Sequence, residues 1–338
     1  MVANSIFYVL QIIGFRIDMA YGLNKYYVMP VSKEAVMAIK SYQDQAELLV
    51  RDYLLADPFI PYTSVLGGIF ACKMVYELAQ LISSLYFKSY ISLTKIQRVE
   101  WNNRCISTLH AFFITAMSLY FVFFSEMYSD HRLAGIVTFR SSPLSTFTLG
   151  ISVGYFLTDL GMILWFYPSL GGMEYVLHHL LSVIAVAYSL LFEEGQLYTF
   201  MVLISETTTP GVNLRWYLDT AGLKRSNAYL INGVVMFFAW LVARVLLFAY
   251  LFYHVYLHYK QVQRMHAFGI FLVLVVPLVL SIMNLMWFGK ILKGLKKQLA
   301  RGSEHTYTEI LPLFFCPYHH LSLYLGCMMP VQTFVVTV

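Results

Sequence analysis

The chain has 338 residues, of which 59% are apolar and only 12% are charged, and 17% of them are aromatic. A soluble domain carries about 25% charged residues, and a large share of any globular surface must stay in contact with water. The composition therefore excludes soluble, disordered and disulfide-scaffold classes, and it indicates an all-α polytopic bundle of transmembrane helices.

The N-terminal residues 1–58 form a predicted extension ahead of the first span. Residues 5–15 are apolar but too short to cross a bilayer, which takes about 20 residues. Within residues 33–57, apolar side chains recur at three- and four-residue steps. This spacing predicts an amphipathic helix that lies at the membrane interface.

Long gaps between charged residues predict seven membrane spans, because each span needs about 20 mainly apolar residues. The first span and its basic loop occupy residues 59–97. The spans lie near residues 59–87, 105–126, 146–167, 176–192, 196–214, 228–255 and 267–289.

The fifth predicted span contains Pro210 and is expected to bend. Proline removes a backbone donor and clashes with the carbonyl four residues earlier, which here belongs to Glu206. The hydroxyls of Thr207, Thr208 and Thr209 can bond the backbone groups that such a break leaves free. We therefore expect a kink beside Glu206.

The basic residues predict the orientation of the chain. Twelve Lys and Arg residues follow the first, fifth and seventh predicted spans, and four lie in the alternate loops. Since Lys and Arg accumulate in cytoplasmic loops, this predicts a lumenal N-terminus and a cytoplasmic basic segment after the last span. The net charge of +5 then reflects topology, and no RNA-binding motif accompanies it, so no nucleic-acid partner is predicted.

The C-terminal residues 299–338 end in an uncharged, proline-divided stretch, for which we expect a re-entrant or unstructured tail. His319 and His320 are adjacent there, but no carboxylate lies nearby to complete a metal site. The four cysteines show no paired spacing. We therefore predict no metal and no cofactor.

Ionisable residues inside the predicted spans nominate a site, because such groups are costly in a bilayer and usually face the bundle interior. The candidate lipid-binding residues are His178, His179, Glu206, Asp159, Arg244 and Asn213. His178, His179 and Glu206 are also the only candidates for a catalytic role. His110 and Asn284 are further polar residues inside spans.

The competing interpretation is internal pairing. Asp159 or Glu206 could neutralise Arg244, and His179 could bond a neighbouring helix. Lys73 and Glu77, four residues apart, are expected to pair with each other.

Six segments carry a resemblance to a known family: RVEWNNRCISTLHA, GYFLTDLGMILW, YVLHHLLSVIAVAYSL, ISETTTPGVNLRWYLD, INGVVMFFAWLVARV and IMNLMWFGKILKGLKK. Together they resemble the TLC-domain family, which ceramide synthases share, over residues 98–298. The resemblance implies six transmembrane helices in that region, an endoplasmic-reticulum or related endomembrane location, and a cavity that accommodates a lipid.

The resemblance to ceramide synthases is incomplete at their functional motif. His178 and His179 match its paired histidines, and Glu206 matches its last acidic position, but Val202 and Leu203 stand where a His-Asp pair is expected. Amine acylation needs a base and a stabilised leaving thiolate. The chain therefore lacks the complete apparatus.

These observations favour a non-enzymatic or weakly enzymatic protein that binds a long-chain acyl lipid or sphingolipid and acts in membrane lipid homeostasis. One alternative is an acyl-CoA-dependent sphingoid-base N-acyltransferase with His178 or His179 as the general base. Another is a lipid or cargo transport receptor. The sequence leaves the identity of the lipid and the formation of a homo-oligomer open.

Overall fold

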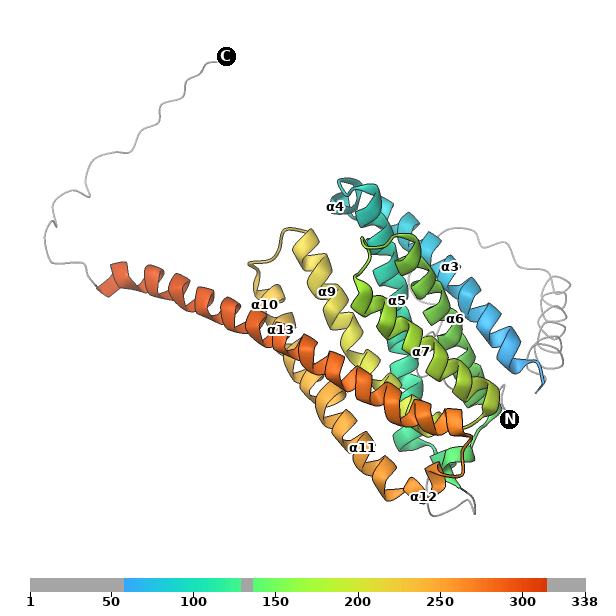
Figure 1. The fold of residues 1–338 in the computed structure, drawn as a ribbon. Helices are drawn as coiled ribbons and strands as arrows, with labels where there is room; N and C mark the ends of the chain where they lie inside the picture. The colour runs from blue at the N-terminus through green and yellow to red at the C-terminus, as the bar shows by residue number, and fades with distance from the viewer. Residues whose placement is uncertain (1–57, 129–135, 315–338) are drawn as a thin grey trace, which may run out of the picture. The chain divides into compact units, whose positions relative to one another are not determined.

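The computed structural model describes residues 58–128 and 136–314, with side chains as far as residue 298. The predicted interfacial helix in residues 33–57 and the pair His319 and His320 lie outside this range. The chain divides into two compact units, residues 1–292 and 293–338. All regular structure in the described ranges is helical, which confirms the predicted all-α class (Figure 1).

Six helices in the described ranges are long and apolar enough to cross a membrane, which confirms a multi-pass protein. They correspond to the first four and the last two predicted spans. Two of them contain π-helical segments, η2 and η6. The spans are α3 (Ile60–Tyr86), α5 (Lys95–Leu119) with η2 (Tyr120–Phe124), α6 (Pro143–Trp165), α7 (Met173–Phe192), α10 (Asn227–Trp240) with η6 (Leu241–Leu246) and α11 (Leu247–Leu257), and α13 (Ala267–Phe314).

Helix α5 begins ten residues before the predicted span, in the stretch that the charges mark as a loop. Thr94 caps it, because its side chain accepts from the backbone N–H of Gln97 while the Gln97 side chain accepts from that of Thr94. The gaps between charges detect only the apolar part of a helix. A short helix, α4 (Lys88–Ile91), fills the rest of the basic loop.

The fifth predicted span is helical but divided into three pieces, α8 (Gln196–Leu203), a 3-10 turn η5 (Ile204–Thr208) and α9 (Thr209–Thr220). Thr207 Oγ1 donates to the carbonyl of Ile204 at 2.6 Å, and Thr208 Oγ1 donates to that of Ser205 at 3.0 Å. Threonine hydroxyls thus bond backbone carbonyls within the 3-10 turn. The regular helix is interrupted at Glu206, where the kink was expected.

The three pieces together run from one end of the bundle to the other. At the start, the N–H of Gly195 donates to the carbonyl of Thr138 at 2.8 Å, within η4 (Val137–Phe139). At the other end, Tyr217 Oη donates to the carbonyl of Trp101 at 2.8 Å, near the start of α5. In Figure 1 these ends lie towards α12 (Tyr259–Val262) and α4, respectively.

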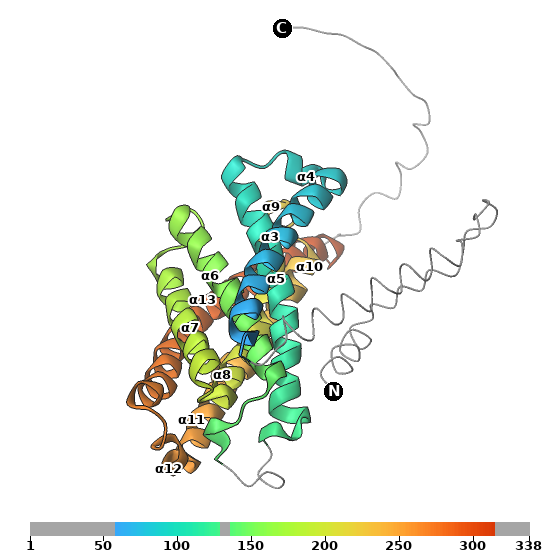
Figure 2. The same cartoon turned by 90° about the vertical axis from the view of Figure 1, so that its right-hand side faces the viewer.

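Helices α3 and α6 pack through small residues. A Cβ added to Gly154 would lie 2.8 Å from the N of Ile69 and 2.9 Å from the Cα of Gly68, and one added to Gly150 would overlap Ser64. Small residues at four-residue spacing let membrane helices approach closely, where dispersion contacts replace the missing hydrophobic drive. Figure 2 shows α3 beside α5 and α6. The contact fixes α6, which carries Asp159.

The centre of the bundle is apolar and well packed. Ile114 of α5, Leu149 of α6, Phe200 of α8 and Leu251 of α11 are all 0% exposed. The short helix α8 therefore lies in the core. By contrast, Lys73 and Glu77 form the predicted pair on the exposed face of α3.

Candidate functional site: a polar centre beside an apolar cavity

Asp159 and His179 form a direct pair between α6 and α7. His179 Nε2 lies 2.6 Å from Asp159 Oδ2, and Asn103 of α5 donates to Asp159 Oδ1 at 2.6 Å. His179 Nδ1 lies 2.9 Å from the carbonyl oxygen of Tyr175. A carbonyl only accepts, so Nδ1 carries a hydrogen and one further proton is shared between Nε2 and the carboxylate. Both ring nitrogens of His179 are therefore engaged within the protein.

The neighbouring His178 is in a different state. Its Nδ1 is buried and has no hydrogen-bond partner in the described residues. Its ring contacts those of Trp287 and His179, with centroids 5.6 Å and 5.3 Å away. Neutral imidazole offers one donor and one acceptor nitrogen, so an uncommitted ring can bond a ligand or accept a proton. Of the two adjacent histidines, His178 is the one with capacity for a ligand.

Glu206 and Arg244 form a second buried pair. Glu206 Oε1 lies 3.8 Å from Arg244 Nη2, and Thr209 Oγ1 donates to Glu206 Oε2 at 2.7 Å. The carboxylate is supplied by the kinked segment η5, and the guanidinium by the π-helical segment η6. Such π segments change the direction of a side chain and are frequent at functional sites.

Arg244 has three further contacts. Its Nε donates to Thr208 Oγ1 at 2.8 Å, and its Nη1 donates to Asn284 Oδ1 of α13 at 3.1 Å. Its Cζ lies 4.5 Å from the ring centroid of Trp240, at cation–π distance. The guanidinium thus joins η5, η6 and α13 in one network.

The two pairs are connected through aromatic side chains. The ring centroid of Trp287 lies 5.6 Å from that of His178 and 6.2 Å from that of Trp240, on which the guanidinium of Arg244 packs. The structure therefore brings together five of the six residues predicted for the site. We call these five the polar centre: His178, His179, Asp159, Glu206 and Arg244.

Asn213, the sixth predicted residue, lies elsewhere. Its Oδ1 accepts from Arg104 Nη1 at 3.0 Å, and its Nδ2 donates to Ser107 Oγ at 2.7 Å. These bonds join α9 to α5. Asn284 does reach the polar centre, through Arg244, whereas His110 stacks on Tyr155 with ring centroids 3.8 Å apart.

Sequence reasoning missed Asn103 and Trp240, which contact Asp159 and Arg244 of the polar centre. Asn103 precedes the predicted second span, which excluded it from the search for intramembrane polar groups. Trp240 lies four residues before Arg244, and helical spacing of an aromatic and a cation is the signal that could have revealed it.

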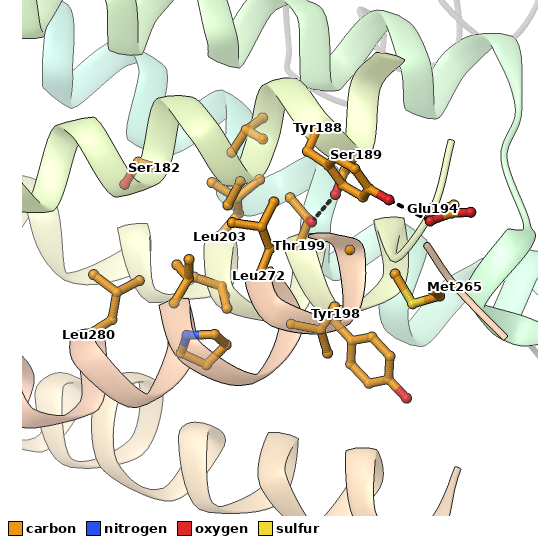
Figure 3. Close-up of a pocket in the computed structure, with 17 residues that line it drawn as sticks. Ser182, Tyr188, Ser189, Glu194, Tyr198, Thr199, Leu203, Met265, Leu272 and Leu280 are labelled. Atoms are coloured by element: carbon orange, nitrogen blue, oxygen red, sulfur yellow. Dashed lines mark hydrogen bonds between the residues drawn. The ribbon is translucent and has the colours of Figure 1, made fainter. Parts of the chain in front are cut away.

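An apolar cavity of about 50 Å³ lies between α7, α8 and α13 (Figure 3). Most of its lining is aliphatic, from Ala185, Val186, Val202, Leu203, Leu272, Val273, Val276 and Leu280. At one end Tyr188 Oη donates to Glu194 Oε2 at 2.6 Å. Val202 and Leu203, which the resemblance to ceramide synthases aligns with their His-Asp pair, are among these residues.

The other end of the cavity adjoins the polar centre. Ser182 lines the cavity, and its Oγ donates to the carbonyl of His178 at 2.9 Å. Leu280 lines it from α13, four residues before Asn284, and Leu203 lies three residues before Glu206. All three separations are close to one helical turn. A polar site and an apolar slot are therefore adjacent.

A search of the described residues finds no group of three His, Cys, Asp or Glu side chains that could hold a metal ion. The polar centre contains one imidazole paired with a carboxylate and one guanidinium paired with another carboxylate. Such a set can bind polar and hydrogen-bonding groups.

A family model described as the TLC domain matches residues 100–293. The chain is 29% identical over 224 residues to TLC domain-containing protein 4-B of Xenopus laevis, which covers 64% of this chain and 82% of that protein. It is 28% identical over 236 residues to TLC domain-containing protein 4 of Homo sapiens, covering 67% and 86%. It is 23% identical over 229 residues to TLC domain-containing protein 4 A of Dictyostelium discoideum, also covering 67% and 86%.

Proposed function

The chain belongs to the TLC-domain family, and we propose that it binds a long-chain lipid and acts in the lipid homeostasis of an endomembrane. One observation carries the proposal: the apolar cavity begins within one helical turn of the polar centre. A lipid has the same two-part chemistry, with a polar head group next to a hydrocarbon chain. Ligand sites are typically apolar pockets with a few convergent polar groups, and this arrangement fits that description.

In this proposal the head group contacts the polar centre through Nδ1 of His178, which has no hydrogen-bond partner among the described residues. Arg244 and Glu206 supply a donor and an acceptor from the opposite side, while the Asp159–His179 pair keeps α6 and α7 in place. The hydrocarbon chain follows the lining of the cavity between α7 and α13.

The cavity volume sets a condition on binding. About 50 Å³ accommodates only a few water-sized groups, since each needs roughly 10–15 Å³ of probe-occupied volume. A full acyl chain therefore requires α7 and α13 to separate. Their contact in this region is made by apolar side chains such as Tyr188, Leu272 and Val276, which can part in a bilayer at little cost because lipid tails are equally apolar.

An endoplasmic-reticulum or related location and a cytoplasmic basic segment after the last span complete the proposal. The basic α4 region and the turn between α9 and α10, with Lys224 and Arg225, lie at one end of the bundle in Figure 1, which supports this orientation. Asp159 and His179 each lie six residues from the α6–α7 turn, or about 9 Å along a helix. The head group would then lie nearer the cytoplasmic face.

A second candidate function is acyl transfer from acyl-CoA to a sphingoid amine. The state of His178 favours it, because an uncommitted imidazole can take a proton from the sphingoid ammonium and so release the free amine that attacks the thioester. The apolar lining at Val202 and Leu203 opposes it, since those side chains cannot stabilise developing charge.

The experiment is to purify the protein in detergent and to identify co-purified lipids by mass spectrometry. Ala185→Phe fills the cavity from α7 and is expected to remove the bound long-chain lipid. Ile184→Phe is the matched control, because Ile184 lies next to Ala185 on the same helix but is 37% exposed and does not line the cavity. Retention of lipid by Ala185→Phe at the wild-type level would refute the cavity assignment.

A parallel assay with acyl-CoA and a sphingoid base separates the two functions. Lipid binding without chemistry predicts no turnover in the wild-type protein and a loss of co-purified lipid in His178→Ala. The opposite result is that the wild-type protein turns over substrate and that His178→Ala abolishes the turnover at an unchanged melting temperature. That result would refute the binding proposal and establish the acyltransferase function.

A further inference from the structure

A groove of about 620 Å³ lies between α3 and α5, close to α4. Met74, Leu78 and Leu81 line it from α3, and Lys95, Arg98 and Asn102 line it from α5. Each set recurs at three- and four-residue steps, so each is one continuous stripe of a helix. None of these residues belongs to the polar centre or to the apolar cavity described above.

The α5 side of the groove carries an excess of positive charge. Glu77, which also lines the groove, is paired with Lys73 on its own helix. Lys95 has no ion pair among the described side chains, and neither has Arg98. The groove therefore favours an anionic group beside α5.

The guanidinium of Arg98 is held in place, but one of its donor nitrogens is left without an acceptor among the described residues. Its Nη2 donates to the carbonyl of Ile91, and its Cζ lies 5.7 Å from the ring centroid of Tyr90. Its Nε is buried and has no hydrogen-bond partner in the described part of the chain. A buried donor without a partner is costly, and an incoming acceptor oxygen would satisfy it.

The α3 side of the groove is apolar. Met74, Leu78 and Leu81 are 45%, 49% and 55% exposed on a helix that is long and apolar enough to span the membrane. In a bilayer such side chains contact hydrocarbon. One wall thus matches an acyl chain, and the other matches an anionic head group.

We propose that this groove binds an anionic phospholipid, with its phosphate at Lys95 and Arg98 and an acyl chain along Met74, Leu78 and Leu81. Its volume lies within the range of about 300–1,000 Å³ that is usual for ligand pockets. Basic pockets between membrane helices near the membrane surface recognise phospholipid head groups by the same charge complementarity. The site is independent of the lipid proposed for the cavity.

Affinity measurements test the charge requirement. The full chain is titrated in detergent with phosphatidylserine and with phosphatidylcholine, and binding is followed by native mass spectrometry. Each basic residue near an anionic lipid contributes about a fivefold change in affinity. Lys95→Gln combined with Arg98→Gln should therefore weaken phosphatidylserine binding about 25-fold and leave phosphatidylcholine unchanged.

Lys296→Gln combined with Lys297→Gln is the matched control, because it removes the same charge from exposed positions outside the groove. An equal loss of affinity in this control would overturn the proposal, as would wild-type affinity in the groove variant. Competition by inorganic phosphate that displaces the lipid completely at low concentration would assign the site to free phosphate instead.

A photo-crosslinking residue at Leu81 tests the occupant without removing charge. The proposal predicts crosslinks that favour phosphatidylserine over phosphatidylcholine in mixed vesicles. The same residue at Leu66, which is 67% exposed on α3 but does not line the groove, should show no preference. Crosslinks from Leu81 to peptides of residues 1–57 would show that the chain itself fills the groove, and would overturn the proposal.

Discussion

Asp159 connects three helices through its two carboxylate oxygens, one bonded to Asn103 of α5 and the other to His179 of α7. Its side chain is 7% exposed, so water cannot replace these partners. Loss of the carboxylate would leave Nε2 of His179 and the amide of Asn103 buried without partners.

We predict that Asp159→Ala lowers the free energy of unfolding by about 3 kcal/mol. Asp159→Asn should retain most of that stability, because an amide can donate to Nε2 of His179 while its oxygen accepts from Asn103. Thermal denaturation of the purified variants in one detergent measures both. Equal losses in the two variants would contradict a pair that shares a single proton.

Glu206 and Arg244 allow a second prediction at this scale. Arg244→Met should lower the free energy of unfolding by about 3–5 kcal/mol, because it leaves Glu206, whose side chain is 11% exposed, without its cation. Adding Glu206→Gln should restore part of the loss, since a neutral amide is less costly to bury than an unpaired carboxylate.

The double-variant cycle over Glu206→Gln and Arg244→Met gives the coupling energy of the pair directly. Purely additive effects would mean that the 3.8 Å separation carries no interaction, and that Arg244 acts through Thr208 and Asn284 alone.

At the scale of elements, the break between α8 and α9 supplies the polar centre with Glu206. Within the 3-10 turn η5, the hydroxyls of Thr207 and Thr208 donate to backbone carbonyls. The hydroxyl of Thr209 donates to the carboxylate of Glu206 instead. Two of the three consecutive threonines therefore bond the backbone, and the third solvates the carboxylate.

The α3–α6 contact gives the third prediction. Gly154→Ala should destabilise the protein, because the new Cβ would lie 2.9 Å from the Cα of Gly68 and would push α3 away. Gly161→Ala on the same helix is the control. A Cβ there meets nothing within 4 Å, and alanine is the better helix former by about 1 kcal/mol.

The melting temperatures of the two variants check this contact. A decrease of several degrees is expected for Gly154→Ala, with no decrease for Gly161→Ala. If Gly154→Ala were as stable as the wild type, α3 would not depend on close approach to α6.

At the scale of the whole molecule, the number of membrane crossings depends on residues 196–220. They connect the end of the bundle near Thr138 to the end near Trp101, although no single piece is long enough to span. Six helices in the described ranges are long and apolar enough to cross, and the seven-span prediction adds residues 196–220 as a further pass. Seven passes would place the two ends of the described chain on opposite sides of the membrane.

The fourth prediction tests this topology by cysteine accessibility in sealed microsomes, in a background without the four native cysteines. Lys224→Cys, after α9, should react with a membrane-impermeant maleimide from the cytosol. Glu193→Cys, between α7 and α8, should react only after permeabilisation. Reaction of both cysteines from the same side would show that residues 196–220 do not cross the membrane.

The predictable part of this fold follows from local chemistry. Apolar runs between charges reveal six long helices because the cost of charge in a bilayer acts on each segment by itself. Pro210 and its threonines predict the kink for the same reason. The sequence did not predict that α5 begins at Lys95, because the first turns of this helix are polar and resemble a loop. The capping box at Thr94 marks its start.

The residues of the polar centre were predictable as a set, but their pairing was not. The cost of placing polar groups in a membrane pointed to the five residues of the polar centre and to Asn213. The side chain of Asn213 instead joins α9 to α5. The sequence left open whether Arg244 pairs with Asp159 or with Glu206. Only the packing of the helices decides this, because the two carboxylates lie on elements 47 residues apart in the chain.

By itself, then, the sequence determined that this protein lies in a membrane, where its long helices run, where one of them breaks, and which residues are too polar to face lipid. The tertiary structure decided that His179 is committed to Asp159 while His178 keeps a nitrogen without a partner, and that an apolar cavity adjoins them. The reason is physical: the cost of burial is a property of each residue, whereas pairing and cavities depend on how the helices pack.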